Sequence, residues 1–272
     1  MYAPWRSPVV RFQGRLLRIL MIGDIVGKPG RRAVKTLLPG LRSELGLDFV
    51  IANGENLAGG FGITLDTAEE ILSSGVDVIT SGNHVWDQKT IVEHLDSDLP
   101  LLRPLNYPPA TPGRGYLVMG DVMVVNLLGR VFVGTTDCPF RAVDALIKEQ
   151  NPIPPIIVVD LHAEATSEKI AMGWFLDGRA SVVAGTHTHV ATADTRILPK
   201  GTGYVSDLGM VGPTNSVIGV ETQDVIERFL TQTPRRLRVA TAGPVRFNSV
   251  LFDIDPSSGK ATDIVRVDRE ID

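Results

Sequence analysis

The sequence is poor in cysteine and aromatic residues, has no excess of positive charge and contains no long apolar run. Cys138 is the single cysteine among 272 residues, which excludes an internal disulfide and fits a reducing compartment such as the cytoplasm. A net charge of −4 provides no general attraction to nucleic acid or to anionic membranes. Every apolar stretch is interrupted well before the ~20 residues that a membrane-spanning helix needs. The composition thus points away from disulfide-bonded, membrane-embedded and basic nucleic-acid-binding proteins.

What the sequence does contain is typical of a globular protein. Hydrophobic residues make up 43% and charged residues 21%, which allows a substantial core. Arg18 and Asp24 interrupt the apolar segment near the start, and no small-residue cleavage site follows, so we do not predict a signal peptide. We expect residues 1–15 to form a loose extension and residues 16–272 to form a single domain.

Several apolar runs stop abruptly at polar clusters. The runs 16–22, 48–52 and 76–80 are each predicted to be buried strands. They are followed by Asp24, by Asn53-Gly54-Glu55-Asn56 and by Ser81-Gly82-Asn83-His84. Because ligands bind outside the carboxyl ends of the strands in sheets built from βα units, this pattern predicts a site at one edge of a sheet.

The rest of the chain continues this alternation. Residues 100–115 contain five prolines and are predicted to form a rigid loop at the rim of the site. Further strands are expected at 116–119, 122–128, 156–161, 180–184, 196–198, 203–206, 245–253 and 261–267, and a loop at 209–213. Helices are expected at 29–45, 65–74, 140–150, 168–176 and 224–230, with Thr64 and Ser167 as N-caps. This order predicts an α/β fold of four layers, α/β/β/α, in which two packed mixed sheets are flanked by helices.

Four of the five histidines lie in the strand-end motifs. His187 and His189 follow the predicted strand at 180–184, and side chains two residues apart on an extended segment point the same way. We therefore expect both imidazoles to face one point, where neutral imidazole is a common metal ligand. An isolated pair of this kind is equally consistent with histidines that bond only to backbone or water.

Together the strand-end residues form a mixed set of oxygen and nitrogen donors. Imidazole suits Zn, Fe, Ni and Cu, whereas carboxylate and carbonyl oxygens suit Mn and Mg. The set is too large for one ion and fits two ions about 3.5–4 Å apart, an arrangement that clamps both oxygens of a phosphoryl displacement. Its members are Asp24, Glu55, Asn56, Asn83, His84, His162, His187 and His189.

The order of these motifs resembles that of the calcineurin-like metallophosphoesterases, and most closely their bacterial YmdB-like branch. The resemblance runs from about Arg18 to Val267. It rests on Gly-Asp-Ile-Val-Gly-Lys-Pro-Gly, Asn-Gly-Glu-Asn, Gly-Asn-His-Val-Trp-Asp, Asp-Leu-His-Ala-Glu-Ala-Thr-Ser-Glu and Gly-Thr-His-Thr-His-Val. The chain departs from the wider superfamily at Val26, where a histidine is usual, and at Glu55, where an aspartate is usual. Both departures are expected in the YmdB-like branch.

The resemblance implies an assignment of ligands. One ion would be held by Asp24, Glu55, Asn56 and His189, and the other by Glu55, Asn83, His162 and His187. The two ions would be Fe or Mn, with Zn or Mg as alternatives.

The resemblance also implies a role for His84, which would bind phosphate and protonate the leaving group. This suits an imidazole, because the side chain exchanges protons near neutral pH; the alternative is an orienting role.

Other polar residues carry weaker signals. Arg103, Arg114 and Arg141 lie near the proline-rich segment and could hold phosphate bidentately, although a solvated surface position fits each at least as well. Asp160 and Glu164 flank His162 and are candidates to orient its imidazole, or to act as structural caps.

We predict a metal-dependent phosphodiesterase that hydrolyses a nucleoside cyclic phosphate or a similar phosphodiester. One alternative is a phosphomonoesterase such as a nucleotidase. Another is a regulatory nucleotide-sensing protein of RNA metabolism, with little turnover and with a protein partner. A small phosphodiester or nucleotide is expected as substrate, with no membrane and no direct nucleic-acid contact, and a homo-oligomer is compatible with the sequence.

Overall fold

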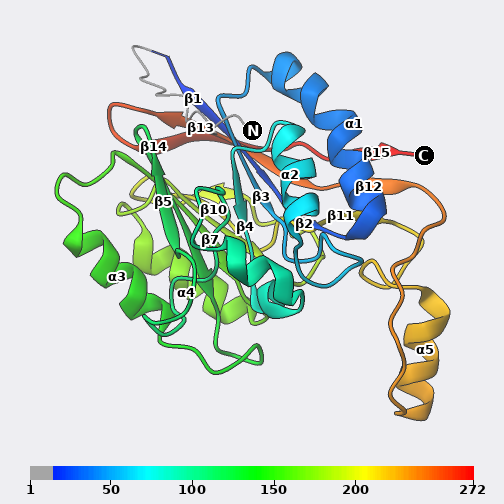
Figure 1. The fold of residues 1–272 in the computed structure, drawn as a ribbon. Helices are drawn as coiled ribbons and strands as arrows, with labels where there is room; N and C mark the ends of the chain where they lie inside the picture. Colours follow the sequence, from blue (N-terminus) through cyan, green and yellow to red (C-terminus); the bar gives the residue numbers. More distant parts are fainter. Residues whose placement is uncertain (1–14) are drawn as a thin grey trace.

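The computed structural model describes residues 15–272 and shows a mixed α/β protein with three sheets (Figure 1). The extension expected at residues 1–15 lies outside the described residues, apart from Arg15. The first sheet has the order β14-β13-β1-β3-β4. β1, β3 and β4 run parallel, β13 is antiparallel to β1, and β14 to β13. Its strands are β1 (Leu17–Ile22), β3 (Phe49–Asn53), β4 (Val78–Thr80), β13 (Ser249–Asp255) and β14 (Lys260–Arg266).

The second sheet has the order β5-β6-β7-β8-β10-β9. β6, β7, β8 and β10 are parallel, and β5 and β9 are antiparallel edge strands. Its strands are β5 (Tyr116–Met119), β6 (Val122–Leu128), β7 (Ile156–His162), β8 (Val182–Thr186), β9 (Arg196–Ile197) and β10 (Gly203–Val205). β6 and β7 are buried along their whole length, as expected of parallel strands that are covered on both faces.

The third sheet was not predicted. It has the order β15-β12-β11-β2 and consists of β2 (Asp24–Ile25), β11 (Met210–Pro213), β12 (Val245–Phe247) and β15 (Arg269–Ile271). The loop expected at 209–213 is therefore mostly strand β11. The strand expected at 245–253 is divided at Asn248 into β12 and β13, which belong to different sheets.

The helices agree closely with the expected ranges. They are α1 (Gly27–Leu45), α2 (Leu65–Ser73), α3 (Pro139–Glu149), α4 (Thr166–Leu176) and α5 (Thr222–Thr231), with the short 3₁₀ helices η1 (Asn83–Trp86) and η2 (Lys89–His94). Thr64 caps α2 as predicted, because its side chain accepts a hydrogen bond from the Thr67 backbone N–H. The Ser167 cap is wrong, since α4 begins at Thr166 with Ala165 as its N-cap and without a side-chain cap bond.

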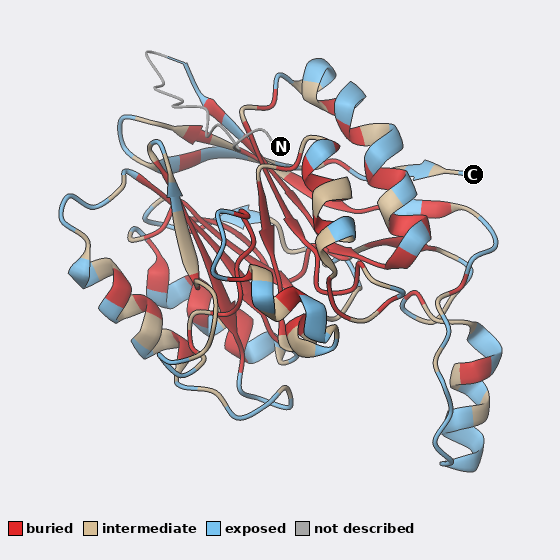
Figure 2. Cartoon of the chain, viewed as in Figure 1, coloured by how far each residue is buried: buried red, intermediate tan, exposed pale blue. Residues whose placement is uncertain are grey.

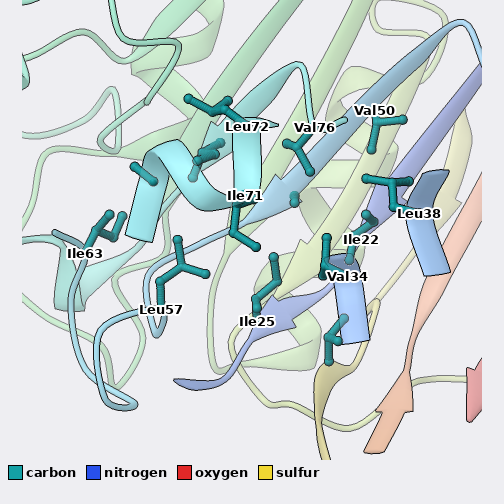
Figure 3. Packing of buried hydrophobic residues seen from close by; sticks show 14 of the residues in the cluster. Ile22, Ile25, Val34, Leu38, Val50, Leu57, Ile63, Ile71, Leu72 and Val76 are labelled. Carbon is teal, nitrogen blue, oxygen red and sulfur yellow. The ribbon is translucent and has the colours of Figure 1, made fainter. Parts of the chain in front are cut away.

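Three hydrophobic clusters fill the interior. The first joins α1 and α2 to the first sheet through residues such as Leu38, Ile71 and Val50 (Figure 3). The second contains residues of both larger sheets, and the third joins the second sheet to α3 and α4. Accordingly, the buried faces of these helices point inward in Figure 2. Among the helices of residues 15–272, none combines the length and apolarity that a membrane crossing requires.

Residues 214–244, which connect β11 to β12, extend from the body and are called the arm (Figure 1). The arm contains α5, of which Asp224 is the single buried residue. At the base of the arm, bridges pair Val217 with Val220 and Val220 with Val239. The base also packs on the body, because a Cβ at Gly60 or at Gly219 would meet the side chain of Val239 or Val26, respectively. This packing holds the base of the arm beside the strand ends described next.

Candidate metal centre

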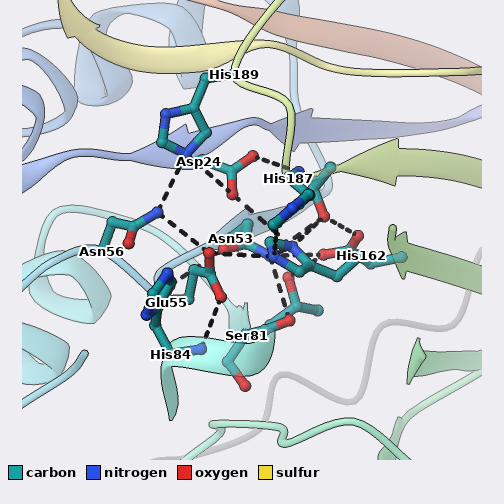
Figure 4. Close-up of polar contacts among 12 residues, drawn as sticks. Asp24, Asn53, Glu55, Asn56, Ser81, His84, His162, His187 and His189 are labelled. Atoms are coloured by element: carbon teal, nitrogen blue, oxygen red, sulfur yellow. Dashed lines mark hydrogen bonds and ion pairs between the residues drawn. The ribbon is translucent and has the colours of Figure 1, made fainter. Parts of the chain in front are cut away.

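The predicted ligands that Figure 4 labels converge at the carboxyl ends of parallel strands from both larger sheets. Asp24 follows β1, and Glu55 and Asn56 follow β3. Asn83 and His84 lie in η1 after β4. His162 is the last residue of β7, and His187 and His189 follow β8. The residues of the predicted site therefore lie at strand ends, and strands of both larger sheets lead into them.

One half of the site is built around His162. Its Nε2 lies 3.1 Å from Glu55 Oε1 and 2.9 Å from His187 Nδ1. Ligand atoms of these three residues all lie within 4.8 Å of one another, close enough to hold one metal ion. All three residues belong to the second predicted ligand set.

The other half is built around Asp24, Asn56 and His189. His189 Nε2 lies 3.2 Å from Asn56 Nδ2 and 3.8 Å from Asp24 Oδ1. Asn56 Nδ2 is also 3.3 Å from Glu55 Oε1. The same Glu55 oxygen therefore faces both halves, which is the position that a bridging carboxylate requires.

Each of the three imidazoles has one nitrogen bonded to a fixed acceptor. His162 Nδ1 lies 2.9 Å from Thr186 Oγ1, which in turn donates to Asp160 Oδ1 over 2.7 Å. His189 Nδ1 donates to the Ile218 carbonyl at 2.8 Å, and His187 Nε2 lies 3.2 Å from Glu164 Oε2. Such partners fix the tautomer and leave the opposite nitrogen with a free lone pair for a metal.

These partners refine the orienting roles expected of two carboxylates. Asp160 does act on His162, but through Thr186. Glu164 contacts His187, not the His162 imidazole that it was expected to orient.

Two unpaired oxygens test whether a metal fits the site. Among residues 15–272, only three buried side-chain polar atoms lack a hydrogen-bond partner, and two of them are Asp24 Oδ1 and Asn83 Oδ1. A buried oxygen without a partner costs about 1–3 kcal/mol, and a bound cation would remove that cost. Both atoms belong to predicted ligands, so the donor set fits metal ions.

The ionisation of the cluster reflects its burial. Burial raises the pKa of Asp24 to about 6, although His189 and His162 oppose the shift. Burial also acts to raise the pKa of Glu55, but His162 outweighs it and lowers this pKa to about 2. For His162, burial lowers the pKa while Glu55 raises it, and the net pKa is about 9. Burial and the neighbouring His162 lower the pKa of His187 to about 3.

His84 lies beside the cluster without joining its imidazoles. Its Nδ1 is 2.8 Å from Asp87 Oδ2, and its backbone N–H donates to Glu55 Oε2 over 3.2 Å. The ring packs edge-to-face against Phe61, with centroids 5.1 Å apart. This position agrees with the separate role expected of His84.

The physical argument that placed His187 and His189 together is wrong. β8 ends at Thr186, and both histidines have positive φ, 102° and 66°, so they do not alternate as on a strand. Each faces a different half of the site. Strained residues of this kind cluster at functional sites. Here a loop, and not an extended strand, brings both imidazoles to the site.

The arginines predicted to bind substrate do not join the cluster. Arg103 is buried, and its guanidinium donates to backbone carbonyls of Pro104, Leu105, Thr111 and Pro112. Arg114 donates to the Ser97 carbonyl. Arg103 therefore stabilises the proline-rich loop, which corrects the phosphate-binding role expected for it. Arg141 lines a different cavity beside α3.

Sequence reasoning missed several residues that shape the site. Thr186 and the Ile218 carbonyl fix imidazoles, and Asn53 joins Glu55 to Asp160 through hydrogen bonds of 3.1 and 3.2 Å. Gly82 is essential for space, because a Cβ there would lie 2.4 Å from both Glu55 Oε2 and His162 Nε2. Asn53, Gly82 and Thr186 lie within the motifs quoted above but had no role assigned, whereas Ile218 in the arm has no signal in the sequence.

The site opens into a cavity of about 300 Å³. It is lined by the polar residues Glu55, Asn56, His84, His187 and His189 and by apolar residues, several of which belong to the arm. A volume of this size lies at the lower end of the ~300–1,000 Å³ typical of small-molecule sites.

The fold and the site together define the class as a phosphoester hydrolase. The chain belongs to the YmdB-like family, because the model of the YmdB-like protein matches residues 20–267.

Individual relatives agree with this assignment. The chain is 47% identical over 255 residues to a Bacillus subtilis protein named 2',3'-cyclic-nucleotide 2'-phosphodiesterase, with 92% of this chain and 96% of that protein covered. A crystal structure of a hypothetical protein from Thermus thermophilus matches with a TM-score of 0.88 at 44% identity, covering 93% and 99% of the two chains. A crystal structure of a novel phosphatase from Mycoplasma pneumoniae matches with a TM-score of 0.88 at 34% identity, covering 94% of each.

Proposed function

We propose that this chain is a metal-dependent phosphodiesterase that hydrolyses a nucleoside cyclic phosphate or a similar phosphodiester at two metal positions. The observation that carries the proposal is the convergence around Glu55 of three imidazoles and of the buried, unpaired oxygen Oδ1 of Asp24. The name of the Bacillus subtilis relative supports the choice of a cyclic nucleotide.

The proposed ligand sets follow from this arrangement. Asp24, Glu55, Asn56 and His189 would hold one ion, and Glu55, Asn83, His162 and His187 the other. Rotation of the Asn56 amide would bring its oxygen to the position where Nδ2 faces His189. The mixed oxygen and nitrogen donors suit Fe or Mn, with Zn and Mg as alternatives.

Such ions, when bound, would neutralise the charge of the phosphate and lower the pKa of water toward ~7, which provides a nucleophile. Proton transfer and positioning would depend on residues of the chain. His84 would protonate the leaving oxygen, because its Nδ1 bond to Asp87 orients the ring. The hydrogen bond from the His84 backbone N–H to Glu55 ties this acid to the bridging carboxylate.

A phosphomonoesterase is the second candidate, favoured by the phosphatase name of the Mycoplasma pneumoniae structure. The deciding experiment measures metal content together with turnover on a panel of cyclic phosphodiesters, linear phosphodiesters and phosphomonoesters. We expect about two metals per chain and sustained turnover, fastest on a cyclic diester. Tight nucleotide binding without turnover would instead support a sensor, and preferential cleavage of monoesters would support a nucleotidase.

We also infer that the two larger sheets pack face to face between α1 and α2 on one side and α3 and α4 on the other, as a four-layer single domain. The three hydrophobic clusters, which alternate between helix–sheet and sheet–sheet packing, support this arrangement. The single Cys138 supports a reducing compartment such as the cytoplasm.

A further inference from the structure

Apolar residues from three distant segments line the cavity together with the polar cluster, and they are called the apolar wall. Val26 comes from the start of α1, and Gly60 and Phe61 come from the glycine-rich loop after β3. The base of the arm completes it. The residues of the apolar wall are Val26, Gly60, Phe61, Ile218, Val220, Leu237 and Val239.

The apolar wall is held rigidly. Phe61 sits in a closed turn in which the Ala58 N–H donates to the Gly62 carbonyl over 2.9 Å, and the Phe61 carbonyl accepts a bond from Gln88. Gly60 has a φ of 97° and contacts Val239 so closely that a Cβ would lie 2.4 Å from that side chain. The position of Phe61 is thus set before any ligand arrives.

The side chains of the apolar wall can make van der Waals contacts with a ligand but have no hydrogen-bonding groups. Two other polar residues line the cavity, and both have partners: Glu164 contacts His187, and Thr188 Oγ1 donates to Asp207 over 2.8 Å. A planar ring could therefore bind by contact and stacking, which tolerates every base because each has a π face.

We propose that the apolar wall binds the nucleobase of the substrate without reading its identity, so that purine and pyrimidine cyclic nucleotides are accepted alike. This inference rests on the proposed function, since the phosphate must lie against the polar cluster for the base to reach the apolar wall. The arm is then part of the substrate site. Its half-buried Leu237 makes the site prefer substrates that carry a base over those that do not.

The test compares 2',3'-cyclic nucleotides of adenine, guanine, cytosine and uracil with glycerol 1,2-cyclic phosphate, which has the same cyclic ester but no base. The variants are Leu237→Ala and the matched control Leu230→Ala, whose side chain lies on α5, is 79% exposed and does not line the cavity. We expect the wild type to turn over all four nucleotides within about tenfold of one another. Leu237→Ala should raise KM for the nucleotides about tenfold and KM for the base-free ester clearly less, and Leu230→Ala should match the wild type.

Three results would overturn the inference and leave the proposed function intact. They are a wild-type preference of about 100-fold or more among bases, equal KM values with and without a base, and an equal effect of Leu237→Ala on both substrate types. The comparison of the four nucleotides uses the wild type alone, so it tests the inference even if Leu237→Ala does not fold. Cleavage of other phosphodiesters but of no cyclic nucleotide would overturn the inference alone. Turnover of phosphomonoesters without cleavage of any phosphodiester would refute the proposed function and the inference with it.

Discussion

His84 differs from the other histidines of the site in its partners. His162, His187 and His189 face carboxylate, amide or imidazole groups of the cluster, whereas the His84 imidazole pairs with Asp87 and packs on Phe61. A residue with these contacts can move a proton without holding a metal. The distinction can be tested, because a general acid matters most when the leaving group is poor.

We expect His84→Ala to retain its metals and to lose about 10²–10⁴ in rate on a cyclic nucleotide, as is typical for loss of a positioned acid. On a nitrophenyl phosphodiester the loss should be clearly smaller, because nitrophenolate leaves without a proton. Steady-state rates with elemental analysis measure both, and His94→Ala, a histidine of η2 outside the site, is the matched control. Equal losses on both substrates with metals retained would assign His84 to phosphate binding alone.

The pKa of His162 makes metal binding dependent on pH. A pKa of about 9 in the metal-free protein means that His162 is protonated at pH 7.5, and coordination requires the neutral imidazole. His187, with a pKa of about 3, is already neutral. Metal binding should therefore displace the His162 proton, and the apparent affinity should rise with pH up to about 9.

Calorimetric titration of the metal-free protein with Mn²⁺, in buffers of different ionisation enthalpy, counts the protons released. About one more proton per chain should be released at pH 7.5 than at pH 9.5, since a proton lost from bound water contributes at both. Equal release at the two pH values would contradict a protonated His162.

At the scale of elements, the turn from β4 into η1 depends on Gly82. Its backbone passes so close to the cluster that a Cβ would lie 2.2 Å from His162 Cδ2 and 2.4 Å from Glu55 Oε2. Both side chains are buried, so neither can move away easily. Gly82→Ala should therefore bind less than one metal per chain and lose at least about 10² in activity, as is typical when catalytic geometry shifts by about 1 Å.

The control for this variant is Gly40→Ala in α1, where a Cβ meets nothing within 4 Å. An alanine in an exposed helical position should stabilise the protein by up to about 1 kcal/mol, with metal content unchanged. Elemental analysis and urea denaturation of both variants make the comparison. Full metal occupancy in Gly82→Ala would show that the cluster can relax around the added methyl group.

Strands that coincide with apolar runs could be predicted from the sequence, and strands without such a run could not. β5 and β6 begin and end where their apolar runs do, and Thr64 marks the start of α2 because its hydroxyl caps the helix. The third sheet escaped prediction because β2 and β15 contain charged residues and no apolar run, and because only Asn248 separates β12 from β13. β11 also contains Gly212 and Pro213, which favour the interpretation as a loop.

The candidate site was predictable in its members but not in its geometry. Residues such as Glu55 and His162 follow apolar runs, so topology alone brings them together. The conformations of His187 and His189, the Ile218 carbonyl and the apolar wall depend on contacts between distant segments. No local pattern encodes such contacts.

At the scale of the whole molecule, the site joins the two larger sheets. Asp24, Glu55 and Asn83 follow strands of the first sheet, with Asp24 itself beginning β2 of the third sheet, and His162 and His187 lie at the ends of strands of the second. At this junction the buried oxygens Asp24 Oδ1 and Asn83 Oδ1 have no hydrogen-bond partner. Metal ions shared between the sheets would therefore stabilise the native state, and they have no equivalent site in the unfolded chain.

Removal of metal should lower the melting temperature as a consequence. Free metal at about 100 times its dissociation constant stabilises the native state by ~2.7 kcal/mol, and 1 kcal/mol shifts the melting temperature of a large domain by ~2–4 °C. We expect dialysis against a chelator to lower the melting temperature by about 5–10 °C, and the original metal to restore it. Calorimetry of the loaded, stripped and reloaded protein measures the shift.

A comparison of Glu55→Ala with Glu93→Ala distinguishes the change in melting temperature caused by metal loss from any direct effect of the chelator on the protein. Glu55 faces both halves of the site, so its loss should abolish most of the shift on stripping, because neither ion keeps a full ligand set. Glu93 is exposed in η2, and its variant should show the same shift as the wild type. If the wild type carries two metals by elemental analysis and yet melts at the same temperature after stripping, the ions do not hold the two sheets together.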